Sequence, residues 1–252
     1  MAKLKGVLKL EGTIDDLTFY RTRDGLVVRR KSSLTAARIK TDPKFGNFRK
    51  SGTEFGHCST IGSQIRKSIA PLLKGLSGRD MINRLVQCLG QIKDLDKRSR
   101  KGKRKLINGM KKLEGRAIWQ QFSFIKYTEV SHEIRNNILI DAAAGTITLR
   151  SWSSESFQTP SEAATHIQLQ FAWLDYNFDG EASPALFQST SIQPLHTTIP
   201  SETLTFALPK TTTGMITLFV ATQFYQEING VYLPLHNQLG RMVAVVKVVV
   251  SK

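Results

Sequence analysis

The residues with the clearest chemical potential are the lysines and arginines gathered between Lys97 and Lys105. Seven of the nine side chains in this stretch are cationic, and none is apolar. Like charges at this density repel one another unless an anion or an acidic partner neutralises them. From residue 93 to residue 116 the chain carries 11 cations and 3 anions. This composition predicts a phosphate-binding surface. A solvated, flexible basic loop is the alternative interpretation.

The charge of the chain is divided unevenly along its length. Residues 1–126 contain 30 Lys and Arg against 10 Asp and Glu, a net charge of +20, whereas residues 127–252 contain 6 against 10, a net charge of −4. Such an asymmetry indicates an anionic partner for the first half, which is nucleic acid, an anionic membrane surface or an acidic protein. Nucleic acid or another polyanion is the partner that we predict.

Recognition of base sequence is not predicted. The chain has no helix-turn-helix, zinc-finger or RNA-recognition signature, which favours binding to the phosphate backbone. Phe19, Tyr20, Phe45 and Phe48 lie near cations, but their spacing fits core packing equally well, so stacking on bases is not predicted. The predicted nucleic-acid-binding residues are Arg21, Arg23, Arg29, Arg30, Lys31, Lys93, Lys97, Arg98, Arg100, Lys101, Lys103, Arg104, Lys105, Lys111, Lys112 and Arg116.

Motifs for catalysis or metal binding are incomplete. The run from Asp175 to Gly180 begins like an EF-hand loop, but the twelfth position is Leu186 instead of a bidentate glutamate, which favours a hairpin turn. His132-Glu133 begins like a metalloprotease helix, yet Asn136 stands where the second histidine is required. No phosphate-binding glycine loop or nucleophile elbow is present. We therefore predict a non-enzymatic binding protein with no metal ion and no cofactor.

The elements that position these residues begin with a β-hairpin. Residues 6–31 alternate between apolar and polar side chains, and Asp24-Gly25 supplies the backbone conformation of a tight turn. The basic residues at positions 21–31 are expected to cluster at one end of that hairpin. Thr41-Asp42-Pro43 predicts a helix start, because a capping side chain precedes a proline.

Three helical segments are expected next. The first continues towards Leu73, the second extends from Arg79 to Leu95, and the third opens at Leu106. Several small residues interrupt the apolar stripe of the first helix, which indicates close packing or a break near Gly62. The residues predicted to form the buried face of that first helix are Phe45, Phe48, Phe55, Ile65, Ile69 and Leu72.

From about Ile134 the apolar period changes to two, which is typical of strands. Short strands with intervening turns and no helical pattern predict an antiparallel β-sandwich of immunoglobulin or fibronectin type. The predicted strands are 136–141, 146–152, 165–175, 186–195, 203–208, 215–226, 230–235 and 241–250.

The predicted fold class is therefore α+β, with two domains. Residues 1–126 form a basic domain of hairpin and helices, and residues 127–252 form the β-sandwich. The chain closes on an apolar strand from Met242 to Val250. If that strand is central it belongs to the core, and if it lies at an edge it is a template for another chain. A self-assembling subunit, with a homo-oligomer formed through β-edge contacts, is therefore the alternative function.

The cellular setting is expected to be cytoplasmic. The N-terminus is basic without an apolar core, so no signal peptide is predicted, and no apolar stretch is long enough to span a membrane. Cys58 and Cys88 are expected to be two reduced thiols inside helices, with one disulfide between them as the alternative.

The first seventy residues contain a series of short motifs, which are Lys5-Gly6, Gly12-Thr13-Ile14, Tyr20-Arg21, Val28-Arg29, Ile39-Lys40-Thr41-Asp42-Pro43, Phe45, Arg49 and Glu54-Phe55-Gly56. In these motifs the chain resembles the N-terminal block of an uncharacterised bacterial family, a domain of unknown function. The resemblance covers a quarter to a third of the chain and implies no activity and no catalytic residues, but it suggests a bacterial, cytoplasmic setting.

Overall fold

The structure is a computed structural model of the 252-residue chain. It describes residues 2–3, 11–22, 25–31, 34–76, 78–125, 130–154, 162–178, 184–207, 214–235 and 241–250. The chain divides into two compact units, Met1–Arg49 and Lys50–Lys252. The boundary predicted at residue 126 falls inside the second unit.

The first unit contains a small antiparallel sheet in the order β1-β4-β3-β2. The predicted hairpin is confirmed, because β3 pairs with β4 from Leu17 opposite Arg30 to Thr22 opposite Gly25. Asp42 caps a helix as predicted, since its carboxylate accepts a hydrogen bond of 2.9 Å from the Lys44 amide. That helix is a short 3-10 helix, however, and the long helix expected to begin here starts at Gly46. The elements are β1 (Ala2–Lys3), β2 (Gly12–Ile14), β3 (Leu17–Thr22), β4 (Gly25–Arg30), α1 (Ala36–Thr41), η1 (Pro43–Phe45) and the beginning of α2 (Gly46–Ser68).

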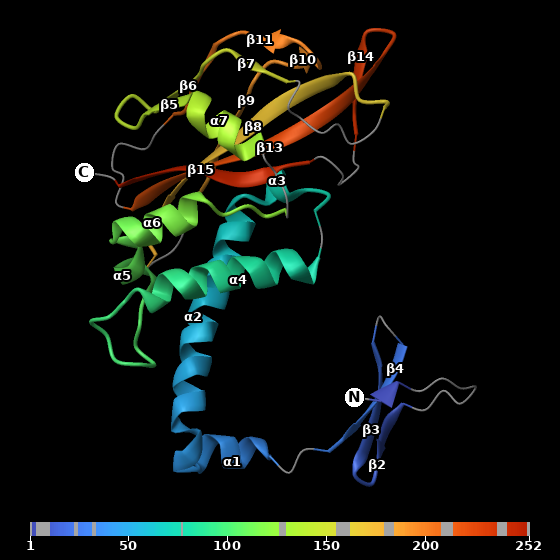
Figure 1. Cartoon of the computed structure of the whole chain (residues 1–252), viewed down its shortest axis with the longest axis vertical. Coiled ribbons are helices and arrows are strands. Elements are labelled where there is room, and N and C mark those ends of the chain that lie inside the picture. The colour runs from blue at the N-terminus through green and yellow to red at the C-terminus, as the bar shows by residue number, and fades with distance from the viewer. Residues whose placement is uncertain are drawn as a thin grey trace. The chain divides into compact units, whose positions relative to one another are not determined.

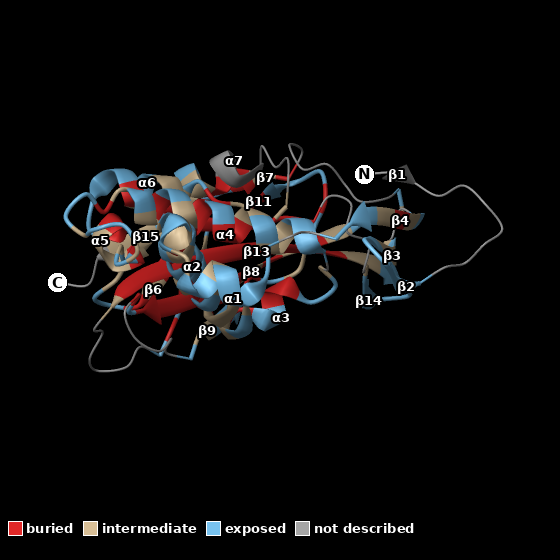
Figure 2. Ribbon diagram, turned by 90° about the horizontal axis from the view of Figure 1, so that it is seen from below, coloured by how far each residue is buried: buried red, intermediate tan, exposed pale blue. Residues whose placement is uncertain are grey.

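The second unit is built on a curled antiparallel sheet with β13 at its centre (Figure 1). Strand β13 pairs with β8 on one side, and with β15 and β14 on the other. The first ten residues of β13 are all buried, which means that both faces of the sheet are covered (Figure 2). The strands of this sheet are β8 (His166–Tyr176), β9 (Leu186–Ser189), β10 (Gln193–Pro194), β13 (Met215–Ile228), β14 (Val231–Pro234) and β15 (Val243–Val250).

Helices cover one face of this sheet. Their buried side chains share a core with Leu174, Phe219 and Val245 of the sheet. Trp119 of α6 is fully buried there, and its indole nitrogen donates a hydrogen bond of 3.1 Å to the Thr217 hydroxyl of β13. Since helices and sheet share one core, residues 50–126 belong to the same unit as the strands. The helices on this face are the remainder of α2, α3 (Ala70–Leu73), α4 (Arg79–Asp94), α5 (Leu106–Met110) and α6 (Leu113–Gln120).

The opposite face is covered by one helix and two small sheets, which surround a second core. The α+β class with an N-terminal hairpin, a helical region and a C-terminal antiparallel sheet is confirmed. The immunoglobulin-like or fibronectin-like sandwich stays a prediction, and the structure shows helices packed against one face of the large sheet. The elements are α7 (Val130–Asn137), β5 (Ile138–Asp141), β6 (Thr146–Leu149), β7 (Trp152–Ser153), β11 (Thr198–Ile199) and β12 (Glu202–Thr205).

One prediction about the helical region is wrong. Phe48 and Phe55 are 63% and 64% exposed, so they do not belong to the buried face of α2. The buried residues of α2 are Glu54, Cys58, Ile61, Gly62 and Ile65, of which only Ile65 was predicted. The helix does not break at Gly62. Of the two alternatives predicted there, close packing is confirmed, because a Cβ atom on Gly62 would lie 3.4 Å from Leu85 and Leu89 of α4. Apolar spacing in α2 fits two neighbouring stripes, and only the position of α4 decides which stripe is buried.

A second correction concerns α7. Its last residues, 136 and 137, were assigned to a strand because the apolar alternation extends back to them, but the strand begins at Ile138. Burial of Ile134 against the sheet holds this short helix in place.

Candidate nucleic-acid interface

The cationic loop, defined as residues Lys97–Lys105, connects α4 to α5 and is held by two buried carboxylates. The first is Asp96, which is only 2% exposed and directly precedes the loop. One of its oxygens accepts hydrogen bonds from the amides of Arg98 at 3.2 Å and Ser99 at 3.1 Å. The other accepts from the Lys105 amide at 3.1 Å and from the Asn108 side chain at 2.9 Å. Asp96 therefore fixes both ends of the loop.

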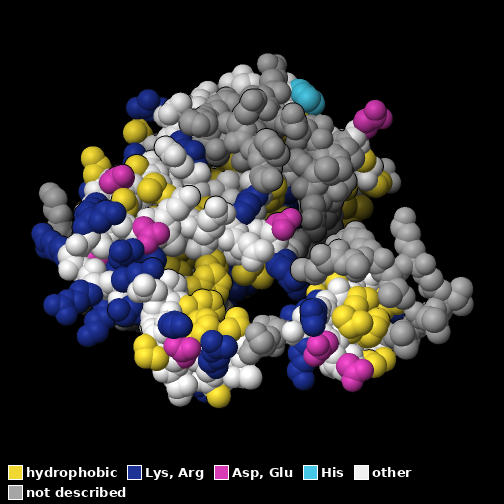
Figure 3. Space-filling view, turned by 60° about the horizontal axis from the view of Figure 1, so that its bottom comes forward, with side chains coloured by type: hydrophobic (Ala, Val, Ile, Leu, Met, Phe, Trp, Pro, Cys, Tyr) yellow, Lys and Arg dark blue, Asp and Glu magenta, His cyan; other side chains and the backbone are white. Residues whose placement is uncertain are grey.

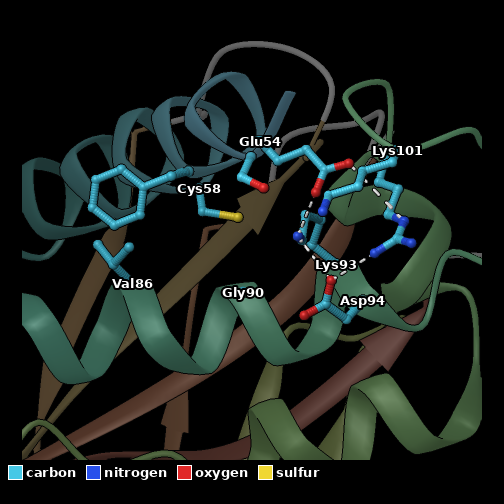
Figure 4. A pocket seen from close by; sticks show the side chains of 10 residues that line it. Glu54, Cys58, Val86, Gly90, Lys93, Asp94 and Lys101 are labelled. Carbon is cyan, nitrogen blue, oxygen red and sulfur yellow. Dashed lines mark hydrogen bonds and ion pairs between the residues drawn. The ribbon is translucent and has the colours of Figure 1, made fainter. Parts of the chain in front are cut away.

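The second buried carboxylate is Glu54 of α2, which is 4% exposed and fixes the middle of the loop. Glu54 Oε1 accepts a hydrogen bond of 2.6 Å from the Gly102 amide, and Oε2 accepts one of 2.7 Å from Lys93 Nζ. Arg104 and Lys93 also bind Asp94, with nitrogen–oxygen distances of 3.0 and 2.8 Å (Figure 4). The two negative charges of Glu54 and Asp94 thus compensate the two positive charges of Lys93 and Arg104.

Gly102 allows the loop to lie directly on α2. Its φ angle is +94°, a conformation that side chains other than glycine rarely adopt. A Cβ atom at this position would lie 2.8 Å from Cγ of Lys50 and 3.3 Å from the Lys50 Cα atom. Both the backbone conformation and the close approach therefore require glycine.

Electrostatics keep this scaffold charged at neutral pH. Burial opposes ionisation of Glu54, but the hydrogen bonds from Lys93 and Gly102 outweigh it and hold the pKa of Glu54 below its usual value. Burial likewise opposes ionisation of Asp96, yet its hydrogen bonds from Asn108 and the loop hold its pKa well below the ordinary range. The pKa of Lys93 is raised, because its bonds to Asp94 and Glu54 outweigh the effect of burial.

The predicted binding residues in the larger unit therefore fall into two groups. Lys93 and Arg104 belong to the internal network, so their charges are already compensated. Within the part of the chain that the structure describes, the exposed cations of the loop that make no ion pair are Lys97, Arg98, Arg100, Lys101 and Lys103.

The remaining predicted cations of this unit are Lys105, which is exposed at the last position of the loop, and three residues that follow the loop. Lys111 and Lys112 are exposed and Arg116 is half-buried. Lys112 Nζ donates a hydrogen bond of 2.6 Å to the Leu95 carbonyl, which leads the side chain back towards the loop. Figure 3 shows lysine and arginine side chains gathered on the left side of this unit. The 11 cations of residues 93–116, less their 3 anions and Glu54, leave a net charge of +7.

The predicted binding residues of the N-terminal hairpin do not gather at its turn. Arg21 belongs to the second pair from that turn, whereas Arg29 and Arg30 lie about 10 to 14 Å further along the strands. Arg21 and Arg30 share one face of the sheet, and Arg29 points to the other, where it lies 5.7 Å from the Tyr20 ring. The prediction of one cluster is wrong, because strand register separates residues that are close in sequence. Lys31 follows at the far end, and Arg23 lies outside the described residues.

The edge of β15 has fewer unpaired backbone groups for another chain to bind than an open edge strand would have. The Phe124 amide donates a hydrogen bond of 2.8 Å to the Val243 carbonyl, and the Val245 amide donates one of 2.9 Å to the Phe122 carbonyl. The Arg135 side chain donates to the Val245 carbonyl at 2.9 Å. The chain itself therefore covers residues 243–245 of this edge, so the homo-oligomer through β15 has no support from this part of the strand.

Other candidate chemistry is limited in the described ranges. Cys58 and Cys88 are buried free thiols, as predicted, and burial raises their pKa values to about 11 and about 12. The described residues contain no group of three or more His, Cys, Asp or Glu placed to hold a metal ion. The Asp175 side chain is buried, while Asp179 and Gly180 of the EF-hand-like run lie outside the described residues. None of the described helices has an apolar stretch long enough to cross a membrane.

Sequence reasoning missed the residues that support the loop. Glu54 was the available signal, because it stands in line with Cys58 and Ile61 on the buried face of α2, where an unpaired carboxylate would be costly. Asp96 is the second residue that was missed. Its role depends on the return of the chain at Lys105 and Asn108, which spacing alone does not reveal.

Comparisons with known proteins identify no relative of this chain. No protein-family model matches the chain, and no curated protein sequence or solved structure is detectably similar to it. The resemblance of the first seventy residues to an uncharacterised bacterial family stays a prediction.

Proposed function

We propose that this protein binds the phosphate backbone of nucleic acids through the cationic loop. The observation that carries the proposal is the way the loop is held. The buried carboxylates of Asp96 and Glu54 accept hydrogen bonds from the backbone of the loop, and Glu54 and Asp94 pair with Lys93 and Arg104. The other cations of the loop are exposed.

This arrangement favours binding over mere solubility. A flexible basic loop would keep a protein soluble without any fixed conformation. Here two carboxylates are removed from water, which costs free energy, and like charges are held close together. Ordering a residue costs about 1–2 kcal/mol of conformational entropy, so a loop that is ordered before binding loses less on meeting a phosphate chain.

A salt titration tests the proposal. Binding of a fluorescent oligonucleotide is measured by anisotropy from about 50 to 300 mM salt, where counterion release dominates phosphate binding. We expect log K to fall linearly with log salt. The triple variant Arg98→Gln/Arg100→Gln/Lys101→Gln is expected to reduce the magnitude of that slope by about 0.9 for each lost contact on duplex DNA, or about 0.7 on a single strand.

Arg79→Gln is the matched control. Arg79 is an exposed cation at the opposite end of α4, about 21 Å along the helix from Lys93. Its loss is expected to leave the slope unchanged. Affinity that does not respond to salt, or a triple variant that binds like the wild type, would overturn the proposal.

A further inference from the structure

A pocket of about 310 Å³ lies between α2 and α4, next to the cationic loop. One side of it is apolar and the other is charged. In Figure 4, Cys58 and Val86 lie on one side, while Lys93, Asp94 and Lys101 lie on the other. The residues that line the pocket are Ser51, Glu54, Phe55, Cys58, Val86, Gly90, Lys93, Asp94, Lys101 and Arg104.

Gly90 lies in α4 between these two sides (Figure 4). A Cβ atom at this position would meet nothing within 4 Å, and the φ angle of Gly90 is not positive. Glycine weakens a helix relative to alanine, so a glycine inside a helix usually has a packing reason, as Gly62 has against Leu85 and Leu89. Gly90 has none, and its effect is to leave the pocket open.

Phe55 provides an exposed aromatic ring at this pocket. It is one position, about 100°, around α2 from Glu54, so the helix directs Glu54 inward and Phe55 towards solvent. Exposed aromatic rings beside cations are the features on which single-stranded nucleic acids stack their bases. The pocket volume is at the lower end of the roughly 300–1,000 Å³ of ligand sites, which suits a single planar ring.

The polar side of the pocket offers a hydrogen-bond acceptor. The Asp94 side chain is 56% exposed, and both of its described contacts, with Lys93 and Arg104, are made by Oδ1. In the described ranges, Oδ2 is therefore left to accept a hydrogen bond from a ligand. An exocyclic amino group, such as that of cytosine, is a suitable donor.

We propose that this pocket holds one unpaired base of a single-stranded nucleic acid. The base stacks on Phe55, its amino edge meets Asp94, and the adjoining phosphate lies against Lys101. This inference rests on the proposed phosphate binding and adds a preference for single strands, since bases in a duplex are stacked and paired.

Filling the pocket without changing its charge tests the inference. Gly90→Leu places a branched side chain in the open space, and Gly90→Ala is the control that adds only a methyl group. Affinities for a short oligo(dC) and for a blunt duplex are compared at one salt concentration. We expect Gly90→Leu and Phe55→Ala to weaken oligo(dC) binding by about 5- to 150-fold, the loss of one stacked base, and to leave duplex binding within about twofold. Gly90→Ala is expected to bind oligo(dC) like the wild type.

A fluorescence readout keeps the inference testable if Gly90→Leu fails to fold. Phe55→Trp introduces an exposed indole into a chain whose Trp119, Trp152 and Trp173 are all buried. Its emission is expected to be quenched by oligo(dC) and not by the duplex.

The outcomes separate the two proposals. Folded Gly90→Leu and Phe55→Ala variants that bind oligo(dC) like the wild type would overturn the base pocket, while salt-dependent binding would leave the proposed function standing. Equal quenching of Phe55→Trp by both nucleic acids would also overturn the pocket. Absence of any salt-dependent binding by the wild type would remove the proposed function and the pocket together.

Discussion

The loop should lose its order when Asp96 loses its charge. Asp96→Asn keeps the shape of the side chain, but it replaces one acceptor oxygen with an NH2 group that faces backbone amides. Four hydrogen bonds to Asp96 are affected, at 2.9 to 3.2 Å. A hydrogen bond to a charged group contributes about 1.5–3 kcal/mol and a neutral one about 1 kcal/mol. Because water replaces part of this loss at a surface loop, we expect the loop to be destabilised by about 2–3 kcal/mol.

Amide hydrogen exchange measures this change directly. A free-energy loss of 2–3 kcal/mol corresponds to exchange that is about 30- to 150-fold faster at the amides of Ser99 and Lys105. Amides inside α4, such as that of Leu89, are expected to keep their protection, because they belong to the helical core.

Glu114→Gln is the matched control. Glu114 is exposed in the first turn of α6, and its substitution changes the net charge by the same amount as Asp96→Asn. The control is expected to leave exchange in the loop unchanged. If Ser99 and Lys105 exchange at the wild-type rate in Asp96→Asn, the carboxylate does not hold the loop and the reasoning about preorganised binding fails.

Three further predictions concern the charge of Asp96, the backbone of Gly102 and the two cysteines. Because the pKa of Asp96 is lowered in the folded chain, the stability that Asp96 gives the loop is present above its unfolded pKa of about 3.9 and is lost as the pH falls below that value. The difference in loop exchange between wild type and Asp96→Asn should therefore stay constant from about pH 5 to 8 and shrink below about pH 4. Gly102→Ala should destabilise the loop by about 1–3 kcal/mol, because the φ of +94° is strained for alanine. At one fixed salt concentration it should also raise the Kd for an oligonucleotide, and Gly90→Ala should leave that Kd unchanged. Cys58 and Cys88 should resist a thiol reagent at pH 8 in the folded protein and react in denaturant, because burial raises both pKa values; rapid reaction of either thiol without denaturant would contradict their placement in the core.

Local features of the fold were predictable from the sequence. The apolar period of 3.6 located α4 within one residue, from Arg79 to Asp94, because its stripe from Leu85 to Ile92 has only one way to face a core. The turn at Asn229-Gly230 was predictable from residue type, because asparagine and glycine readily adopt the positive φ angles that such a hairpin requires, and both do so here.

Features that depend on contacts distant in sequence were not predictable. The Gly102 amide meets Glu54 across 48 residues, and only the packing of α2 on α4 brings the two together. The same packing decides that Phe55 is exposed while Cys58 is buried, although both fit an apolar helical stripe. The size of the N-terminal unit was also hidden, because apolar periodicity does not show that residues 50–126 share a core with the sheet.

The role of a cation in this protein depends on what lies beside it and not on its place in a basic run. Releasing both Lys93 and Arg104 to a phosphate would leave Glu54 as a buried, uncompensated carboxylate, and breaking a buried ion pair in this way costs about 3–5 kcal/mol. An exposed ion pair with a phosphate contributes much less, at about 0–1 kcal/mol. Lys93 and Arg104 are therefore part of the scaffold even though they lie in the most basic stretch of the chain. Phosphate binding falls to exposed neighbours such as Lys101, which gain a partner without depriving a buried group of its own.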